Sequence, residues 1–174
     1  MKIFISLNLI LSLTVLRSES LYEVYQNAGP GNGYDKYMVL DPNIIYTGGF
    51  GTSLYSVLLE GNGAVIDLQG GTGIWMSGDE SISPPLVIKR CTIMNGGYYG
   101  VNFSGYGNHE IIDCNFINDV WGIQVGEHSY TTIRNCNLID NTYGLAIIGL
   151  DSEVNLAYCN GWGNDQTYMS NCPG

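Results

Sequence analysis

Four cysteines return at nearly constant spacing in the second half of the chain. The intervals are 23, 22 and 23 residues, and the residues are Cys91, Cys114, Cys136 and Cys159. Thiols can bind zinc, form disulfides or pack as small apolar side chains. The sequence has no CxxC pair and only two histidines, which argues against zinc. The regular spacing favours a column of buried free thiols, and disulfides between neighbouring thiols are the alternative.

Three aromatic residues recur with a similar period. Tyr99, Trp121 and Tyr143 each precede a glycine and follow one another at intervals of 22 residues. If they are exposed, their apolar ring faces and polar edges form a platform on which sugar rings can stack. If they are buried at a corner, they form a ladder in the core. The sequence leaves both interpretations open.

A repeated unit must position these side chains. Segments 86–108, 109–130, 131–152 and 153–174 align on their cysteines, and each has an Ile or Leu three places before its Cys. Each unit contains short runs of alternating apolar and polar residues, separated by Gly, Asn and Asp. A unit this short cannot bury its own apolar face. Stacked copies can, because each strand pairs with its equivalent in the next unit.

The repeat predicts an all-β fold, a single-stranded parallel β-helix (solenoid) of about five to six coils of 22–23 residues. In such a solenoid one sequence place becomes one column in space, which puts the four cysteines in an interior column. Asn95, Asn118 and Asp140, four places after the first three cysteines, form a second column at a bend, where their side chains satisfy the turn backbone. We expect an N-terminal cap and first coil in residues 21–54 and β-helix repeats in residues 55–174. The last unit loses the pattern after its Cys, so it is either a C-terminal cap or a truncated end.

The chain resembles the right-handed parallel β-helix repeat proteins of the pectin lyase-like superfamily. The residues that carry the resemblance are the Ile, Cys, apolar and Asn places of each unit and the Tyr-Gly or Trp-Gly pairs, over roughly residues 55–160. The resemblance, with the general rule for parallel crossovers, implies right-handed coils. That superfamily includes pectate lyases, polygalacturonases, sugar epimerases, phage tailspikes and non-catalytic surface proteins, so fold does not imply one function.

The resemblance also suggests where chemistry would be placed. Lys89 and Arg134, two places before a Cys, and Glu110, four places before one, should share an outer sheet face. In a pectate-type lyase Arg134 would be the base and Glu110 a ligand of calcium. The alternative is that the three residues form ion pairs between strands on the surface, which contribute little to stability. Asp113 and Asp119 are the closest approach to the paired carboxylates of the polygalacturonase type. No Arg-x-Lys pair accompanies them.

The N-terminus indicates export. A lysine at position 2 precedes an apolar run over residues 3–16, and Ser18 and Ser20 offer small residues before a cut at Leu21, so residues 1–20 read as a signal peptide. Without them the chain keeps four basic and 15 acidic residues, which disfavours nucleic acid as a partner. We expect no membrane insertion and no metal, unless calcium serves a lyase.

These observations predict a secreted or cell-surface module that binds or scaffolds extracellular polysaccharide and lacks a complete catalytic set. The alternative is a calcium-assisted polysaccharide lyase or a fragment of one, and a purely structural solenoid is the third reading. The oligomeric state is left open.

Overall fold

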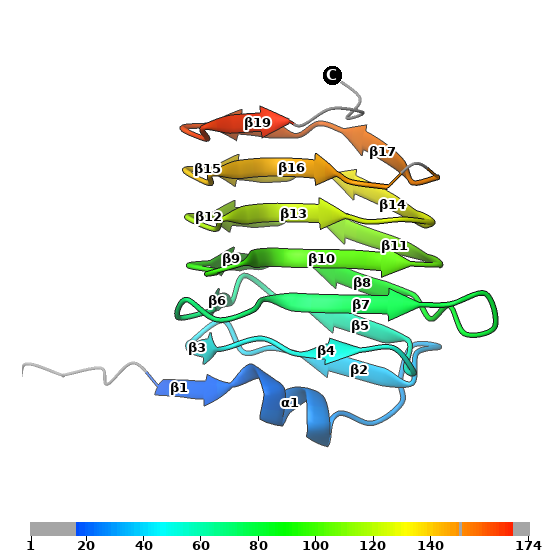
Figure 1. Cartoon of the computed structure of the whole chain (residues 1–174). Coiled ribbons are helices and arrows are strands. Elements are labelled where there is room, and N and C mark those ends of the chain that lie inside the picture. The colour runs from blue at the N-terminus through cyan, green and yellow to red at the C-terminus, as the bar shows by residue number, and fades with distance from the viewer. Residues whose placement is uncertain (1–16, 150, 169–174) are drawn as a thin grey trace, which may run out of the picture.

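The chain folds into a stack of coils, each built from short strands (Figure 1). The computed structural model describes residues 17–149 and 151–168 of the 174. Every pairing between its named strands is parallel and joins a strand to its equivalent in the next coil. The prediction of an all-β parallel β-helix is therefore confirmed.

Three parallel sheets run along the stack, and each is named here by its members. The first has the order β1 (Arg17–Ser20), β3 (Ile44–Thr47), β6 (Val65–Asp67), β9 (Thr92–Met94), β12 (Asn115–Ile117), β15 (Asn137–Ile139) and β18 (Asn160–Trp162). The second has the order β4 (Gly51–Thr52), β7 (Ile74–Gly78), β10 (Tyr99–Gly105), β13 (Trp121–Val125), β16 (Tyr143–Ile147) and β19 (Gln166–Tyr168). The third has the order β2 (Lys36–Val39), β5 (Val57–Glu60), β8 (Leu86–Lys89), β11 (Gly107–Ile112), β14 (Ser129–Arg134) and β17 (Glu153–Ala157). We call them the β1, β4 and β2 sheets after their first strands.

The predicted number of coils was too low. The β1 sheet has seven strands and the other two have six, so the solenoid makes about seven turns rather than five to six. At the C-terminal end the last unit keeps all three strands although Gly161 and Trp162 replace its usual residues. Backbone pairing such as Asn137 with Asn160 continues there because it does not depend on the side chain. At the other end, β1 adds a strand before the expected first coil.

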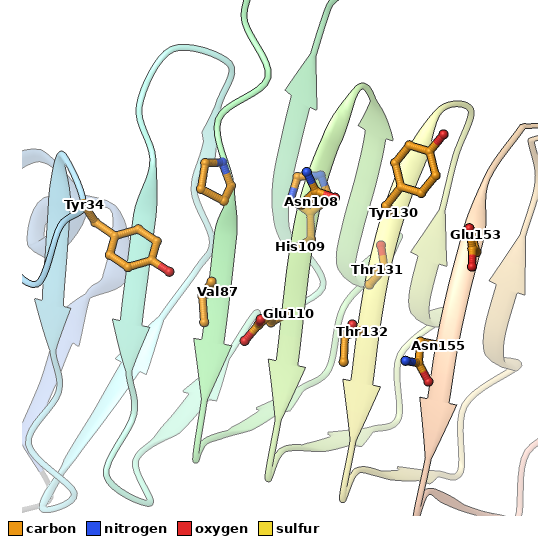
Figure 2. Close-up of a pocket in the computed structure, with 11 residues that line it drawn as sticks. Tyr34, Val87, Asn108, His109, Glu110, Tyr130, Thr131, Thr132, Glu153 and Asn155 are labelled. Carbon is orange, nitrogen blue, oxygen red and sulfur yellow. The ribbon is translucent and has the colours of Figure 1, made fainter.

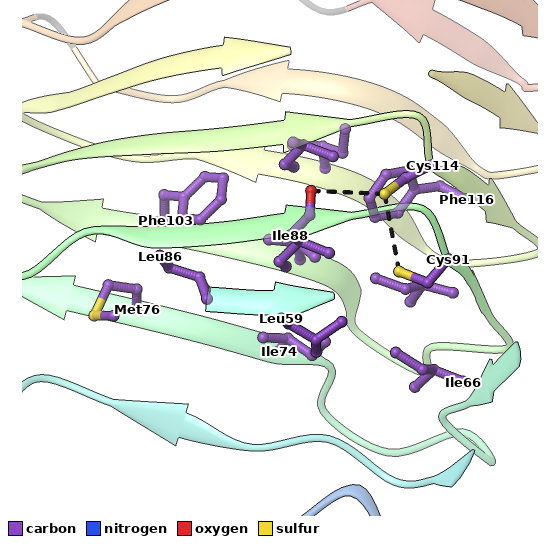
Figure 3. Packing of buried hydrophobic residues seen from close by; sticks show 14 of the residues in the cluster. Leu59, Ile66, Ile74, Met76, Leu86, Ile88, Cys91, Phe103, Cys114 and Phe116 are labelled. Carbon is purple, nitrogen blue, oxygen red and sulfur yellow. Dashed lines mark hydrogen bonds between the residues drawn. The ribbon is translucent and has the colours of Figure 1, made fainter. Parts of the chain in front are cut away.

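The core lies between the three sheets and consists of aligned apolar side chains (Figure 3). Phe103 and Phe116 are its largest fully buried residues, and both are completely inaccessible to solvent. The strand register places apolar side chains next to apolar side chains of neighbouring coils. Phe116, for example, pairs with Ile93 on one side and with Leu138 on the other. Each fully buried side chain of this kind stabilises the fold by about 1.5–3 kcal/mol relative to an exposed one.

The corners are set by residues in the left-handed region of backbone space. At the corner that leads out of the β1 sheet, Asn95, Asn118 and Asp140 have φ of 61°, 57° and 52°, and Gly163 continues the series with 69°. Asn, Asp and Gly are the residues that adopt this conformation at least cost. These residue types therefore return at this corner in the coils of the repeat region.

One short helix, α1 (Leu21–Asn27), lies at the N-terminal end of the stack (Figure 1). Its Leu21 and Tyr25 are buried, and the ring of Tyr25 stacks on Phe50 at a centroid distance of 4.5 Å. Of the predicted signal peptide, residues 1–16 lie outside the described residues. Residues 17–20 form β1, which pairs with β3, so a cut before Leu21 would remove this terminal strand.

Within the described ranges, no helix is long and apolar enough to cross a membrane.

Candidate functional site

A groove of about 470 Å³ lies on the outer face of the β2 sheet (Figure 2). Its lining comes from four consecutive strands, β8, β11, β14 and β17, and from Tyr34 and Pro85 in the loops before β2 and β8. It therefore runs along the solenoid axis and crosses coils that lie roughly 4.8 Å apart. A long ligand could contact several equivalent places at once.

Two outward columns form the floor of this groove. In the first, Asn108 pairs with Tyr130 and Tyr130 with Glu153; in the second, Val87, Glu110, Thr132 and Asn155 pair in turn. Except for Val87, the second column offers oxygen and amide groups to solvent. Val87 is 3% exposed. The groove thus combines two phenol rings, amides, threonine hydroxyls and two carboxylates, and no Lys or Arg is among its lining residues.

The acidic character of the groove affects the pKa of Tyr34. Burial and the negative charge of Glu110 raise the pKa of the Tyr34 phenol. Figure 2 shows the hydroxyl of Tyr34 directed toward Glu110.

His109 lies beneath this face and points into the core. It is 1% exposed, its ring stacks on Phe103 at 4.3 Å, and its Nδ1 accepts a hydrogen bond from the N–H of Leu86 at 3.2 Å. Burial lowers the pKa of His109 to about 4. The imidazole is therefore neutral at physiological pH and belongs to the packing of the core.

Only part of the predicted charged cluster lines the groove. Glu110 does, whereas Lys89 and Arg134 occupy the neighbouring outward column, where Ile112 pairs with both. Within the described ranges none of the three forms an ion pair. No group of three or more His, Cys, Asp or Glu side chains in those ranges is placed to hold a metal ion.

The structure brings the predicted aromatic residues together on the β4 sheet. Tyr99 pairs with Trp121 and Trp121 with Tyr143, and all three are half-buried. The rings of Trp121 and Tyr143 stack with centroids 4.3 Å apart and an interplanar angle of 27°. Each ring covers one face of the other, so these two faces are closed to a sugar ring.

The four repeated thiols line one corner between the β2 and β1 sheets. Cys91, Cys114 and Cys136 are buried, Cys159 is partly exposed, and all four are free. The Sγ atoms of Cys91 and Cys114 are 3.8 Å apart, and the Sγ atom of Cys114 also lies 3.8 Å from the carbonyl oxygen of Ile88 (Figure 3). The hydrogen bond with Cys114 and burial raise the pKa of the Cys91 thiol well above its usual value. The buried Cys91 thiol is therefore an unreactive packing group. The fifth cysteine, at position 172, lies outside the described residues.

Asn95, Asn118 and Asp140 stand at the corner after the β1 sheet. The side-chain amide of Asn118 donates to Asn95 at 2.8 Å, and that of Asn95 donates to Asp67 at 3.0 Å. Sequence reasoning missed a second amide ladder on the outer face of the β1 sheet, in which Asn160 donates to Asn137, Asn137 to Asn115, and Asn115 to Thr92. The signal was present as an Asn directly after Cys114, Cys136 and Cys159, at intervals of 22 and 23 residues.

The two aspartates considered for hydrolysis are not brought together. Asp113 is exposed at the corner before β12, whereas Asp119 is buried at the corner after it. Tyr34 and Tyr130 were missed as groove residues. Tyr130 could have been found from the alternation that precedes each Cys, because it lies two places before Thr132. Tyr34 could not, because a loop outside the repeats carries it.

A family model described as the right handed beta helix region matches residues 72–172, which is more than half of the chain. Neither the curated proteins nor the solved structures gave a match. The match agrees with the stacked parallel coils and with the columns they create. The chain belongs to the right-handed β-helix family.

Proposed function

We propose that this β-helix binds an uncharged polysaccharide along the groove on the β2 sheet. The observation that carries the proposal is the groove itself, about 470 Å³, which crosses four coils and is lined by phenol, amide, hydroxyl and carboxylate groups. Sugar polymers present alternating hydroxyls and apolar ring faces, which such side chains match.

The charge of the groove selects the class of ligand. Glu110 and Glu153 line it without a neighbouring cation in the lining, and the whole chain carries a formal net charge of −10. An anionic polymer such as polygalacturonate would be repelled unless a cation bridged it. Neutral polymers of glucose, mannose or xylose meet no such repulsion.

The proposal includes export of the protein, because extracellular polysaccharide is the predicted ligand. Its support is the basic and then apolar N-terminal sequence, with small residues at positions 18 and 20. Sequencing the N-terminus of protein recovered from the medium tests this part. We expect Leu21 as the first residue, and a product that keeps residues 1–16 would contradict it.

Binding is tested with hexasaccharides of glucose, mannose and xylose by calorimetry. Tyr130→Ala removes a ring from the groove, where the residue is 50% exposed. Tyr22→Ala is the matched control, because Tyr22 lies on α1 and is 53% exposed. We expect at least one hexasaccharide to bind, Tyr130→Ala to weaken it about tenfold or more, and Tyr22→Ala to leave it unchanged. Equal affinities for the two variants would contradict the proposed site.

The lyase alternative makes a different prediction. Polygalacturonate incubated with the protein and calcium would yield unsaturated products that absorb in the ultraviolet. If these products appear and Arg134→Ala abolishes them, the protein is a lyase and the binding-only proposal is wrong.

The aromatic column of the β4 sheet is the other candidate site. If Trp121→Ala abolishes hexasaccharide binding and Tyr130→Ala does not, the sugar binds at this column and not in the groove.

A further inference from the structure

A ladder of two buried side chains and one half-buried side chain links consecutive coils at the corner after the β1 sheet. Asn164 Oδ1 accepts from the main-chain N–H of Asn141 at 2.9 Å, and Asn141 Oδ1 accepts from the N–H of Asp119 at 2.9 Å. Asp119 Oδ1 in turn accepts from the N–H of Gly96 at 2.6 Å. The three side chains, which we call rungs, therefore occupy equivalent places in consecutive coils. Asp119 has a carboxyl group where Asn141 and Asn164 have amides.

The second side-chain atom of each rung also occupies an equivalent place. A Cβ built on Gly122 would lie 3.2 Å from Asn141 Nδ2, and one built on Gly144 would lie 3.4 Å from Asn164 Nδ2. A Cβ built on Gly100, the same place one coil earlier, would lie 2.7 Å from Asp119 Oδ2. Asp119 Oδ2 thus stands where the other two rungs have an N–H₂ donor.

The groups that surround this place are hydrogen-bond acceptors. Asn141 Nδ2 donates to the carbonyl of Phe116 at 3.1 Å and to Asn164 Oδ1 at 3.0 Å, and Asn164 Nδ2 donates to the carbonyl of Leu138 at 2.7 Å. Phe116 pairs with Ile93 in the register. One coil earlier, the equivalent acceptors are therefore the carbonyl of Ile93 and Asn141 Oδ1. Asp119 Oδ2 is buried there and has no donor directed at it.

We propose that Asp119 is a neutral carboxylic acid in the folded protein, whose Oδ2–H replaces the missing amide donor, and that its ionisation opens the link between these two coils. An ionised Oδ2 would face acceptor oxygens without a proton between them, which is unfavourable in a buried site. The carboxylic acid supplies one donor and one acceptor at the places where the amides of Asn141 and Asn164 have their N–H₂ group and their oxygen. The pair of coils joined here contains the strands β9–β10 and β12–β13, so the link lies beside Tyr99 and Trp121.

The electrostatic environment agrees with a neutral carboxyl. Burial raises the pKa of Asp119 to about 8, and the hydrogen bond from Gly96 opposes this only in part. The side chain is surrounded by Gly96, Gly100, Phe116 and Asn141, none of which titrates.

No charged residue compensates for an ionised Asp119 from the neighbouring strands. β9, β10, β12, β13, β15 and β16 contain no Asp, Glu, Lys, Arg or His, and their titratable groups are the half-buried phenols of Tyr99 and Tyr143. Asp140, which adjoins Asn141 in the next coil, is exposed. The pH dependence of the link is therefore assigned to Asp119 alone.

The sign of the effect follows from linkage. The unfolded chain releases the Asp119 proton near its ordinary pKa of 3.8, whereas the folded protein holds it up to about 8. The stabilising contribution is complete below pH 3.8 and is lost as the pH rises through this window. Over most of the window the unfolding constant rises roughly tenfold per pH unit from this group.

The test is a carbon-13 NMR titration of the Asp119 carboxyl in the wild-type protein, together with urea unfolding of two variants. We expect a titration midpoint near 8. Asp119→Asn keeps the donor at every pH, so the ratio of wild-type to variant unfolding constants should increase at least a hundredfold between pH 4 and pH 8. Asp140→Asn, at the exposed neighbouring place, should leave the corresponding ratio unchanged. A midpoint below pH 5, or parallel pH profiles for wild type and Asp119→Asn, would overturn the proposal. The wild-type titration decides the matter if the variant does not fold.

Discussion

Trp121 and Tyr143 stack on one another at 4.3 Å because they hold the same place in consecutive coils. The separation is close to the spacing between neighbouring strands, so the stacking follows from register. One aromatic residue per repeat therefore produces a ladder of rings along the solenoid. Such a pair contributes about 0.5–1.5 kcal/mol beyond the apolar area that it buries.

The first prediction concerns this aromatic ladder. Trp121→Ala should lower the free energy of unfolding by about 2–4 kcal/mol, because it removes a half-buried ring and the stacking contact of that ring with Tyr143. It should leave hexasaccharide affinity within about twofold of wild type, because the groove lies on another sheet. Urea unfolding and calorimetry on the same preparation measure both quantities. Lost affinity at full stability would show that the rings, and not the groove, bind sugar.

The thiols give a prediction about chemical reactivity. Cys91, Cys114 and Cys136 are exposed by 2%, 1% and 0%, whereas Cys159 is partly exposed. Iodoacetamide should therefore modify Cys159 well before the other three in the native protein, and all four at similar rates in urea. Mass spectrometry of the labelled peptides gives the order. Rapid native labelling of Cys114 would be incompatible with the interior column.

The corner residues give a prediction about backbone conformation. Asn118 has a φ of 57° and donates through its side chain to Asn95. Asn118→Gly loses the hydrogen bond but keeps the preferred conformation, whereas Asn118→Ala loses both. The alanine variant should be less stable than the glycine variant by about 1 kcal/mol. Thermal and urea unfolding provide the comparison, and a more stable alanine variant would contradict this view of the corner.

The buried histidine gives a second prediction on pH dependence, opposite in sign to that of Asp119. Burial lowers the pKa of His109 from 6.5 to about 4, so the unfolded chain takes up a proton between these values while the folded chain does not. Stability is therefore lost as the pH falls from 6.5 to about 4, and the loss amounts to about 3 kcal/mol. His109→Gln, which retains an acceptor for the N–H of Leu86, should lack this term.

Proton NMR of the imidazole provides the direct check on His109. A titration midpoint near pH 4 agrees with the buried neutral ring. A midpoint near 6.5 would place the ring in solvent. Because the His109 and Asp119 contributions overlap in pH and oppose one another, each must be measured as a difference between the wild type and its own variant.

The sequence was sufficient for the fold because its repeat is strict where the backbone must turn. In the three units that contain Cys91, Cys114 and Cys136, a Cys before the strand of the β1 sheet, an Asn or Asp after it and then an aromatic-glycine pair define one coil. The coil count was less predictable. At the C-terminal end, Gly161 and Trp162 remove the side-chain pattern while the strands continue to pair through their backbones.

The candidate site was only partly predictable for a related reason. Glu110, Thr132 and Asn155 occupy one outward column that alternation within the repeat defines, and Glu110 was predicted there. The groove also needs Tyr34, which reaches the β2 sheet from a loop that has no counterpart in the other coils. Asp119 was visible as a carboxylate, but its role depends on burial beside Asn141, which periodicity alone does not reveal.

The most direct test of the account is an amide NMR titration with a hexasaccharide of glucose, mannose or xylose that binds. We predict that the largest shifts fall on the backbone amides of Glu110, Thr132 and Asn155 and their neighbours in β11, β14 and β17, in one line across the coils. Shifts concentrated at Tyr99, Trp121 and Tyr143, or saturable binding without shifts in the β2 sheet, would contradict a polysaccharide groove on this face.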